Sequence, residues 1–118
     1  MTDTRLYGLN TCDTCRKAKA WLKQNGIAHE FIDYRNNPVD SATLKAWAAK
    51  VGGWTKLVNR SSTTWRFLDD AQKSPSGDAE WLALIAANPA LVKRPVLQTA
   101  DGAVSVGFTE SSYKLRFA

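Results

Sequence analysis

Residues 6–24 read LYGLNTCDTCRKAKAWLKQ and contain both cysteines of the chain, Cys12 and Cys15. The first four residues are apolar and rich in strand formers, which predicts a short strand. From Cys12 on, the stretch contains neither Pro nor Gly and places apolar side chains at helical spacing, which predicts a helix. Asn10 and Thr11 lie between the two patterns and can cap that helix. We therefore expect both cysteines where a strand leads directly into a helix.

The next part of the chain predicts a second strand and a series of helices. Residues 27–34 carry apolar residues between polar ones, as a strand does. Asp40 can cap a helix that ends at Gly52. Short helical turns are expected within residues 54–68, and Asp78 can cap a further helix.

The C-terminal part predicts a β-hairpin and a last helix. Strand patterns at 95–99 and 103–107 flank the pair Asp101-Gly102, which is typical of a tight turn. Thr109 can then cap a helix. The chain therefore is expected to end in the order strand, strand, helix.

The complete order of elements is β-α-β, then helices, then β-β-α. A chain of 118 residues has the size of one compact domain. We therefore expect a single α/β domain over residues 1–118, with a mixed sheet and a helical segment inserted at about 38–92.

The charge and hydropathy of the chain exclude some classes of function. Sixteen Lys and Arg against eleven Asp and Glu give a net charge of +5, which favours anionic partners. No nucleic-acid-binding motif accompanies this charge, so direct binding of nucleic acid is not expected. No apolar run reaches the roughly 18 residues of a membrane span, and residues 1–5 lack the features of a signal peptide. The cytoplasm is the expected compartment, without membrane association.

Cys12 has the surroundings of a reactive thiol. Unpaired N–H groups and the positive end of the helix dipole meet at a helix start and favour thiolate over thiol. Arg16 and Lys17 add positive charge, and cysteines in such settings have pKa values of roughly 3.5 to 7.5. Cys15, three residues on, shares one helix face with Cys12 and can act as a resolving thiol. Alternatively, Cys15 only fills space in the core.

The sequence does not support a metal site. A structural zinc site needs four ligands, and the only other good nitrogen or sulfur donor is His29. No motif connects His29 to Cys12, so we expect a role at the edge of the second strand rather than that of a general base.

Two arginines stand beside residues that break regular structure: Arg60 follows Asn59, and Arg94 precedes Pro95. Guanidinium groups match phosphate-like or carboxylate groups, so arginines that meet at a helix N-terminus form an oxyanion pocket. Alternatively, each is a solvated surface residue. The Arg94–Pro95 bond is a candidate cis peptide that shapes the pocket wall.

Five segments spread over almost the whole chain resemble the arsenate reductase-like (ArsC/Spx/YffB) family of the thioredoxin-fold superfamily. They are YG at 7–8 with CDTCRKA at 12–18, TTWR at 63–66, NPAL at 88–91, KRPV at 93–96 and VGF at 106–108. The resemblance implies a thioredoxin-like sheet with an inserted helical segment. It also implies that Cys12 is the nucleophile and that Arg94 binds an oxyanion before a cis Pro95.

Arsenate reductases of this family attack arsenate with that cysteine, and then use glutathione and glutaredoxin to release arsenite and reset the enzyme. In this chain the family's middle arginine corresponds to Asn59 or Arg60, depending on a one-residue choice of alignment. Gly107 stands where the family has an arginine in the last strand. The loss of this donor argues against arsenate as the substrate.

Two subgroups of the family fit different features. The two cysteines followed by RKA at 16–18 resemble the redox switch of Spx-type regulators, which bind RNA polymerase. The segments at 63–66 and 106–108 are more similar to the YffB-type subgroup, thought to be glutathione- or thiol-dependent reductases.

We therefore predict a cytoplasmic thiol oxidoreductase with no bound cofactor. The Cys12 thiolate attacks a small oxidised thiol or an oxyanion, and Cys15 or glutathione resolves the adduct, with glutathione, glutaredoxin or thioredoxin as reductant. The residues predicted to hold the anionic part are Thr11, Arg16, Arg60 and Arg94. The alternative is an Spx-like redox-sensing transcriptional regulator that binds RNA polymerase.

Overall fold

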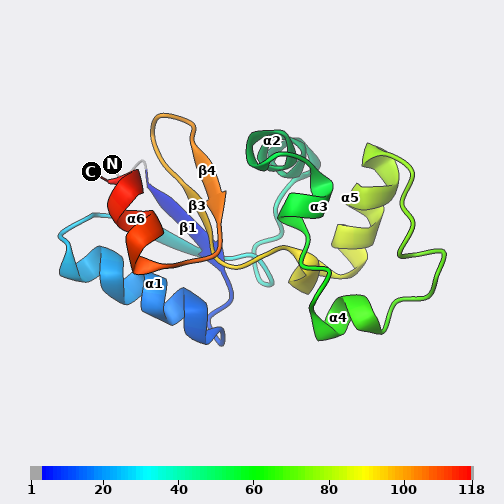
Figure 1. The fold of residues 1–118 in the computed structure, drawn as a ribbon, viewed down its shortest axis with the longest axis horizontal. Helices are drawn as coiled ribbons and strands as arrows, with labels where there is room; N and C mark the ends of the chain where they lie inside the picture. Colours follow the sequence, from blue (N-terminus) through cyan, green and yellow to red (C-terminus); the bar gives the residue numbers. More distant parts are fainter. Residues whose placement is uncertain (1–3, 118) are drawn as a thin grey trace. The chain divides into compact units, whose positions relative to one another are not determined.

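The computed structural model describes residues 4–117, which divide into two compact units (Figure 1). Unit 1 joins the N-terminal part of the chain, up to Tyr34, to the C-terminal part from Arg94. Unit 2 is the intervening segment, Arg35–Lys93.

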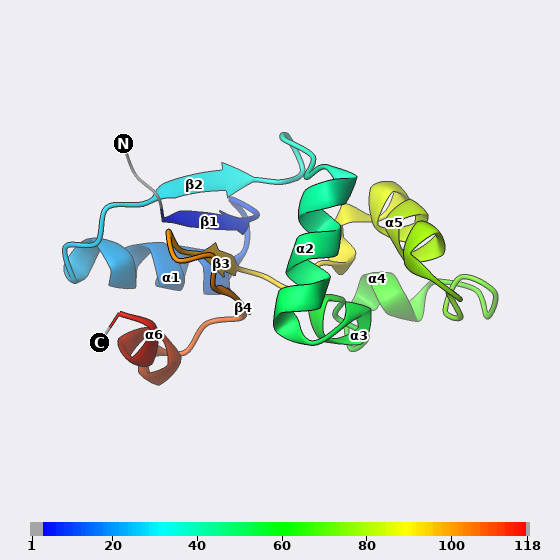
Figure 2. The ribbon, with the colours of Figure 1, turned by 90° about the horizontal axis from the view of Figure 1, so that it is seen from above.

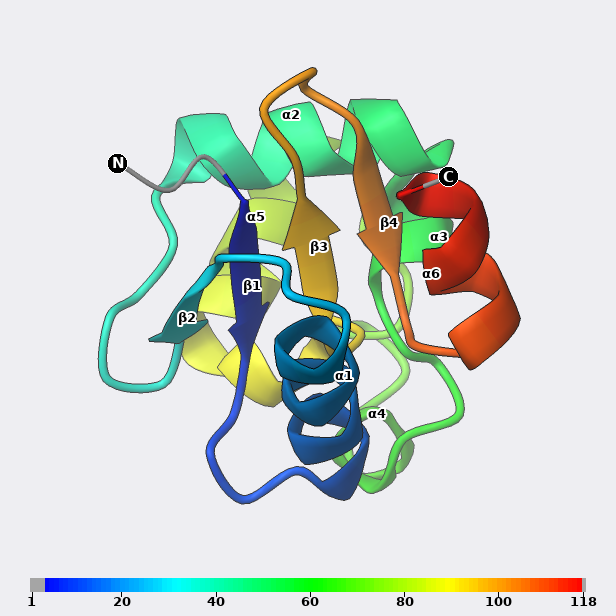
Figure 3. The same ribbon diagram turned by 90° about the vertical axis from the view of Figure 1, so that its left-hand side faces the viewer.

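Unit 1 contains a four-stranded mixed sheet, as predicted. Its strands are β1 (Arg5–Gly8), β2 (Glu30–Asp33), β3 (Val96–Gln98) and β4 (Val104–Val106), and they lie in the order β2-β1-β3-β4 (Figure 3). Strand β1 is parallel to β2 and antiparallel to β3, and β3 is antiparallel to β4. The parallel pair brings the carboxyl ends of β1 and β2 to the same edge of the sheet.

Two helices, α1 (Asp13–Gln24) and α6 (Glu110–Arg116), cover one face of this sheet (Figure 3). The rings of Trp21 on α1 and Tyr113 on α6 pack at nearly a right angle, with ring centroids 5.6 Å apart. Apolar side chains of both helices and of β1 and β3 form one core, because helical spacing points them to the same side. The buried members of this core are Leu6, Ala18, Trp21, Leu22, Leu97 and Tyr113.

The start of α1 differs from the prediction. The helix begins at Asp13, and its N-cap is Cys12 rather than Asn10 or Thr11. Cys12 has an extended backbone, with φ −87° and ψ 122°, and its carbonyl accepts the first helical hydrogen bond, 3.0 Å from the nitrogen of Arg16. The thiol therefore stands at the cap position itself.

The second strand and the hairpin strands are shorter than predicted. Strand β2 begins only at Glu30, since the N–H of Ile27 donates to Leu22 at the end of α1 (2.9 Å) and the chain is still leaving that helix. The hairpin between β3 and β4 is confirmed. Its loop is closed by a hydrogen bond of 3.1 Å from Thr99 to the carbonyl of Ala103.

Unit 2 consists of helices α2 (Ser41–Val51), α3 (Trp54–Leu57), α4 (Thr63–Arg66), α5 (Asp78–Ala87) and the 3-10 turn η1 (Pro89–Leu91). Helix α2 contacts α3 and α5, and η1 contacts α5 and α4 (Figure 2). The short helices α3 and α4 confirm the predicted helical turns. No helix within residues 4–117 has the length and apolar character needed to cross a bilayer.

The caps of these helices follow the sequence in most cases. Asp40 caps α2 by accepting from the N–H of Thr43 (2.7 Å), and Gly52 ends α2 in the left-handed conformation at φ 104°. Thr109 caps α6 in a capping box. The prediction for Asp78 is wrong, because Gly77 is the N-cap of α5 and the Asp78 carboxylate instead accepts from the indole N–H of Trp54 (2.7 Å).

Replacing a core leucine tests this arrangement. Leu97 of β3 is fully buried in the core cluster. We therefore expect Leu97→Ala to lower the free energy of unfolding by about 2–5 kcal/mol in urea denaturation. Leu115→Ala is the control, since this side chain is 81% exposed and its loss changes stability by about 0.5 kcal/mol at most. Equal effects of the two substitutions would contradict the assigned core.

Candidate active site

Cys12 is half-buried at the N-terminus of α1, where free backbone N–H groups collect. Its side chain makes no capping hydrogen bond that meets the usual distance and angle limits. The backbone N–H groups of Cys15 and Thr14 nevertheless lie close enough to stabilise a thiolate. Partial burial raises the pKa of Cys12, and the opposing effects of these amides, the Cys15 thiol and the Arg94 charge outweigh it. The net result is a pKa below the ordinary value for cysteine.

Cys15 has the opposite character. It is 1% exposed and lies among core residues of α1. Burial raises the pKa of Cys15 to about 11, and the neighbouring sulfur of Cys12 adds to the rise, while a backbone N–H of Leu9 and the charge of Arg94 oppose it. The two thiols are unbonded in this structure. At neutral pH, Cys15 is therefore the protonated partner of a more acidic Cys12.

Gly8 makes room for the sulfur of Cys15. A Cβ atom added at Gly8 would collide with Sγ of Cys15 and lie 3.5 Å from the ring of Phe31. Gly8 is the last residue of β1, so the end of the strand and the first turn of α1 approach each other more closely than any side chain permits. In the sequence, Gly8 stands out only as part of the family resemblance. Its contact with Cys15 joins a strand to a helix, and local sequence patterns do not reveal such a contact.

Arg94 lies at the junction before β3, and its bond to Pro95 is cis, as predicted. Its guanidinium is the cation that lowers the pKa of Cys12, and it also acts on Cys15. Arg94 thus supplies the positive charge beside the sulfur that the sequence analysis attributed to Arg16 and Lys17. Whether Pro95 shapes a substrate pocket stays a prediction.

Tyr34 is a member of the site that the sequence analysis missed. It follows β2 directly, is 2% exposed, and its N–H donates to the carbonyl of Gly8 (3.1 Å). Burial raises the pKa of Tyr34 to about 12, although the charge of Arg94 and a hydrogen bond that its guanidinium donates to the hydroxyl oxygen oppose the rise. Its position in the sequence could have indicated this, because Tyr34 ends the predicted second strand and the carboxyl ends of parallel strands β1 and β2 meet at one edge of the sheet.

Two predicted anion-binding residues lie on the surface near the start of α1. Thr11 is exposed in the turn before the helix. Arg16 is exposed and forms an ion pair with Asp13, one turn earlier on the same helix. A role for either residue in binding a substrate stays a prediction.

The remaining predicted arginine, Arg60, belongs to unit 2. It is exposed in the turn between α3 and α4. The side chain of its neighbour Asn59 is used within that turn, where it accepts from the N–H of Ser61 (3.0 Å). Of the two residues that can match the family's middle arginine, Arg60 is therefore the one with an exposed side chain, and its role stays a prediction.

Gly107 occupies a backbone position that suits glycine. It follows β4 at φ 79°, in the left-handed region that residues with a side chain rarely adopt, and its N–H donates to the carbonyl of Pro95 (2.9 Å). An arginine at this position would be strained with the present backbone.

His29 lies just before the second strand. The Nδ1 atom of His29 lies 3.0 Å from the carbonyl oxygen of Ile27, just before β2. Because a carbonyl can only accept, this nitrogen carries the proton. Among residues 4–117, no three His, Cys, Asp or Glu side chains are grouped as metal ligands.

Removing Arg94 tests the electrostatics of Cys12. Since its positive charge favours the thiolate, we expect Arg94→Ala to raise the pKa of Cys12, so that the pH profile of alkylation by iodoacetamide shifts to higher pH. Mass spectrometry locates the modified cysteine. Arg16→Ala is the matched control, and we expect it to leave the profile nearly unchanged. A larger shift in Arg16→Ala than in Arg94→Ala would contradict the role assigned to Arg94.

Gly8→Ala tests the close approach of β1 and α1. We expect this overpacking to lower the free energy of unfolding by about 1–3 kcal/mol. The same substitution in a Cys15→Ala background should cost clearly less, because the sulfur that the new methyl group meets is gone. Equal costs in the two backgrounds would show that Gly8 is not limited by Cys15.

Comparison with known proteins agrees with this architecture. The family model described as the ArsC family matches residues 7–115. An uncharacterised protein of Haemophilus influenzae is 41% identical over 113 residues, which cover 96% of this chain and 97% of that protein. The global transcriptional regulator Spx of Enterococcus faecalis is 29% identical over 92% of this chain and 82% of its own length.

A solved structure shares the fold over almost its full length. The protein named YFFB (PA3664) superimposes with a TM-score of 0.88 at 39% identity, and the match covers 98% of this chain and 99% of that one. Both the sequence model and the structure therefore match nearly end to end. The chain belongs to the ArsC family, with its thioredoxin-like α/β fold.

Proposed function

We propose that this ArsC-family protein is a thiol-dependent oxidoreductase in which Cys12 is the nucleophile. The observation that supports this most directly is the lowered pKa of Cys12, beside Arg94 and the first amides of α1. The thiolate is the reactive form of cysteine, so a more acidic thiol at a half-exposed position is suited to attack. The cytoplasm, a reducing compartment, is proposed as the place where this chemistry operates.

Reduction of a disulfide substrate takes two exchange steps. The Cys12 thiolate attacks one sulfur of the substrate, the substrate S–S bond breaks, and one thiolate leaves. Cys15 then loses its proton and attacks Sγ of Cys12, which releases the second thiolate and forms a Cys12–Cys15 disulfide. The two cysteines have thereby given two electrons to the substrate. Two molecules of glutathione, or the dithiol of a glutaredoxin or thioredoxin, return them.

The two thiols are suited to act in this order. Part of the rise in the pKa of Cys15 comes from its hydrogen bond to Cys12 and from the negative charge of Cys12. When the sulfur of Cys12 is covalently bonded to the substrate, this charge is absent, and Cys15 becomes more acidic. Cys15 thus stays protonated and unreactive until Cys12 has formed an adduct with the substrate.

The substrate is proposed to carry a negative group that Arg94 can bind. A guanidinium matches carboxylates as well as oxyanions, so glutathione disulfides fit this requirement. Gly107, in place of the family's last arginine, leaves the site with one oxyanion donor fewer than arsenate reduction uses in the family. Further contacts to the anionic part are proposed for Thr11 and Arg16, with Pro95 at the pocket wall.

The second candidate is a redox-sensing regulator that binds RNA polymerase. It is favoured by the similarity to the regulator Spx of Enterococcus faecalis, which extends over 92% of this chain. In this case the Cys12–Cys15 disulfide would change binding to the polymerase, and the protein would show no turnover.

Cysteine variants separate these functions. We expect Cys12→Ser to abolish reduction of a glutathione mixed disulfide, because the attacking thiolate is lost. With no free glutathione added, we expect Cys15→Ser to accumulate a Cys12–glutathione adduct, because nothing inside the protein resolves it. Intact-protein mass spectrometry detects this adduct.

Full turnover by Cys12→Ser would exclude the proposed nucleophile. Absence of turnover in the wild type, together with capture of RNA polymerase in only one redox state, would support the regulator instead.

A further inference from the structure

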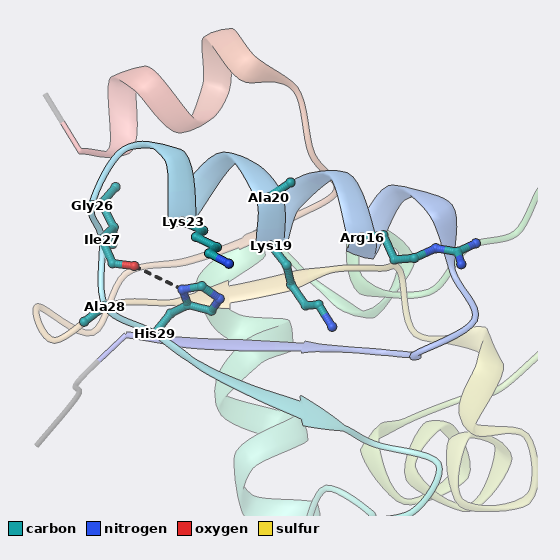
Figure 4. A pocket seen from close by; sticks show the side chains of 8 residues that line it. All are labelled: Arg16, Lys19, Ala20, Lys23, Gly26, Ile27, Ala28 and His29. Atoms are coloured by element: carbon teal, nitrogen blue, oxygen red, sulfur yellow. Dashed lines mark hydrogen bonds between the residues drawn. The ribbon is translucent and has the colours of Figure 1, made fainter.

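An open groove of about 810 Å³ lies along α1, within unit 1 (Figure 4). One side is formed by Arg16, Lys19 and Lys23 of α1, and the other by residues 26–29, between α1 and β2. Cys12 is not among its lining residues, and Arg16 is the one lining residue that the proposed function also uses.

All charged side chains that line the groove are basic. Three basic side chains follow one another along α1 at spacings of three and four residues, which places them on the same side of the helix. None of the eight lining residues is acidic. Asp13, outside the groove, pairs with Arg16, so the lysines supply most of the uncompensated charge.

Lys19 and Lys23 reach from α1 toward the side of β2 (Figure 4). The ammonium group of Lys19 lies 4.2 Å from the centre of the Phe31 ring, and this cation–π contact favours the observed direction of the side chain. The ring of His29 stands opposite Lys23, and its Nδ1 is held by the carbonyl oxygen of Ile27 (3.0 Å).

The groove is also lined by three apolar side chains: Ala20 of α1, and Ile27 and Ala28 of the loop before β2. These side chains offer contact area to one or two apolar groups of a ligand. They are too few and too small to anchor a bilayer, which takes larger apolar or aromatic side chains.

The spacing of the basic side chains favours an extended anionic ligand over a compact one. From Arg16 to Lys23 the helix rises about 10 Å, so the cations form a row and do not converge on one point. A row suits carboxylates spaced along a peptide, whereas a compact polyanion needs converging donors. A single nucleic-acid strand stacks successive bases on several aromatic side chains, whereas His29 is the one aromatic ring among the residues that line this groove.

We propose that this groove binds an acidic segment of a partner protein, with an apolar side chain of that segment on Ala20, Ile27 and Ala28. The proposal concerns binding alone and does not depend on the redox chemistry of Cys12.

The probe for this site is a fluorescein-labelled peptide of three Glu-Glu-Ala-Leu repeats, titrated with the full chain and followed by fluorescence anisotropy. We expect binding that weakens with added salt. The double variant Lys19→Gln, Lys23→Gln should bind about fivefold more weakly, since two exposed charge pairs are lost. A peptide with Gln in place of every Glu should not bind.

The matched control is the double variant Lys50→Gln, Lys56→Gln, which changes the net charge equally at exposed positions of unit 2. It should bind the peptide nearly as the wild type does. Circular dichroism verifies that both double variants are folded.

Three results would overturn the proposal: no binding of the peptide, equal weakening in both double variants, or tighter binding of an oligothymidine strand or of phosphatidylserine vesicles through Lys19 and Lys23. Equal weakening would mean that net charge alone attracts the peptide. None of these results bears on turnover at Cys12, so the two proposals fail separately.

Discussion

The contact on which the candidate site depends is the approach of the Cys15 sulfur to the backbone of Gly8. No side chain fits between them, and the first turn of α1 therefore lies directly against the end of β1. This approach places Cys12, the N-cap of α1, at the edge of the sheet where β1 and β2 both end. Tyr34 is bound to the same glycine through its N–H, so both strand ends and the helix start are joined at Gly8.

Two thiols three residues apart acquire opposite properties from this arrangement. Cys12 is half-exposed and benefits from helix amides and from Arg94, while Cys15 points into the core and loses solvation. The more acidic thiol is thus the accessible one, and the less acidic thiol is protected behind it. A disulfide between them would replace the Cys12 thiolate and the Cys15 thiol with an uncharged S–S bond. The redox state would thus change the charge at this edge of the sheet.

At one position that the family resemblance assigns to oxyanion binding, this chain has a glycine, Gly107. Gly107 adopts a left-handed conformation, and its neighbour in space is the carbonyl of Pro95. Arg94 keeps its place before the cis proline and acts on the sulfur of Cys12. Unit 1 thus holds the proposed nucleophile, Cys12, beside one cation, Arg94. Under the proposed function, this pair suits thiol–disulfide exchange with an anionic substrate better than capture of arsenate.

Local patterns in the sequence determined the helices, the hairpin and the position of the cysteines at a helix start, because caps, spacing and turn pairs act over a few residues. The mixed sheet was expected from the order of the elements and from the family resemblance. The ends of the strands were less well predicted. Strand β2 begins later than expected because Ile27 still bonds to the end of α1 and does not pair with β1. Tyr34 and the effect of Arg94 on Cys12 were decided by tertiary structure alone. They are 22 and 82 residues from Cys12 along the chain, and only the pairing of β1 with β2 and β3 brings them to one edge.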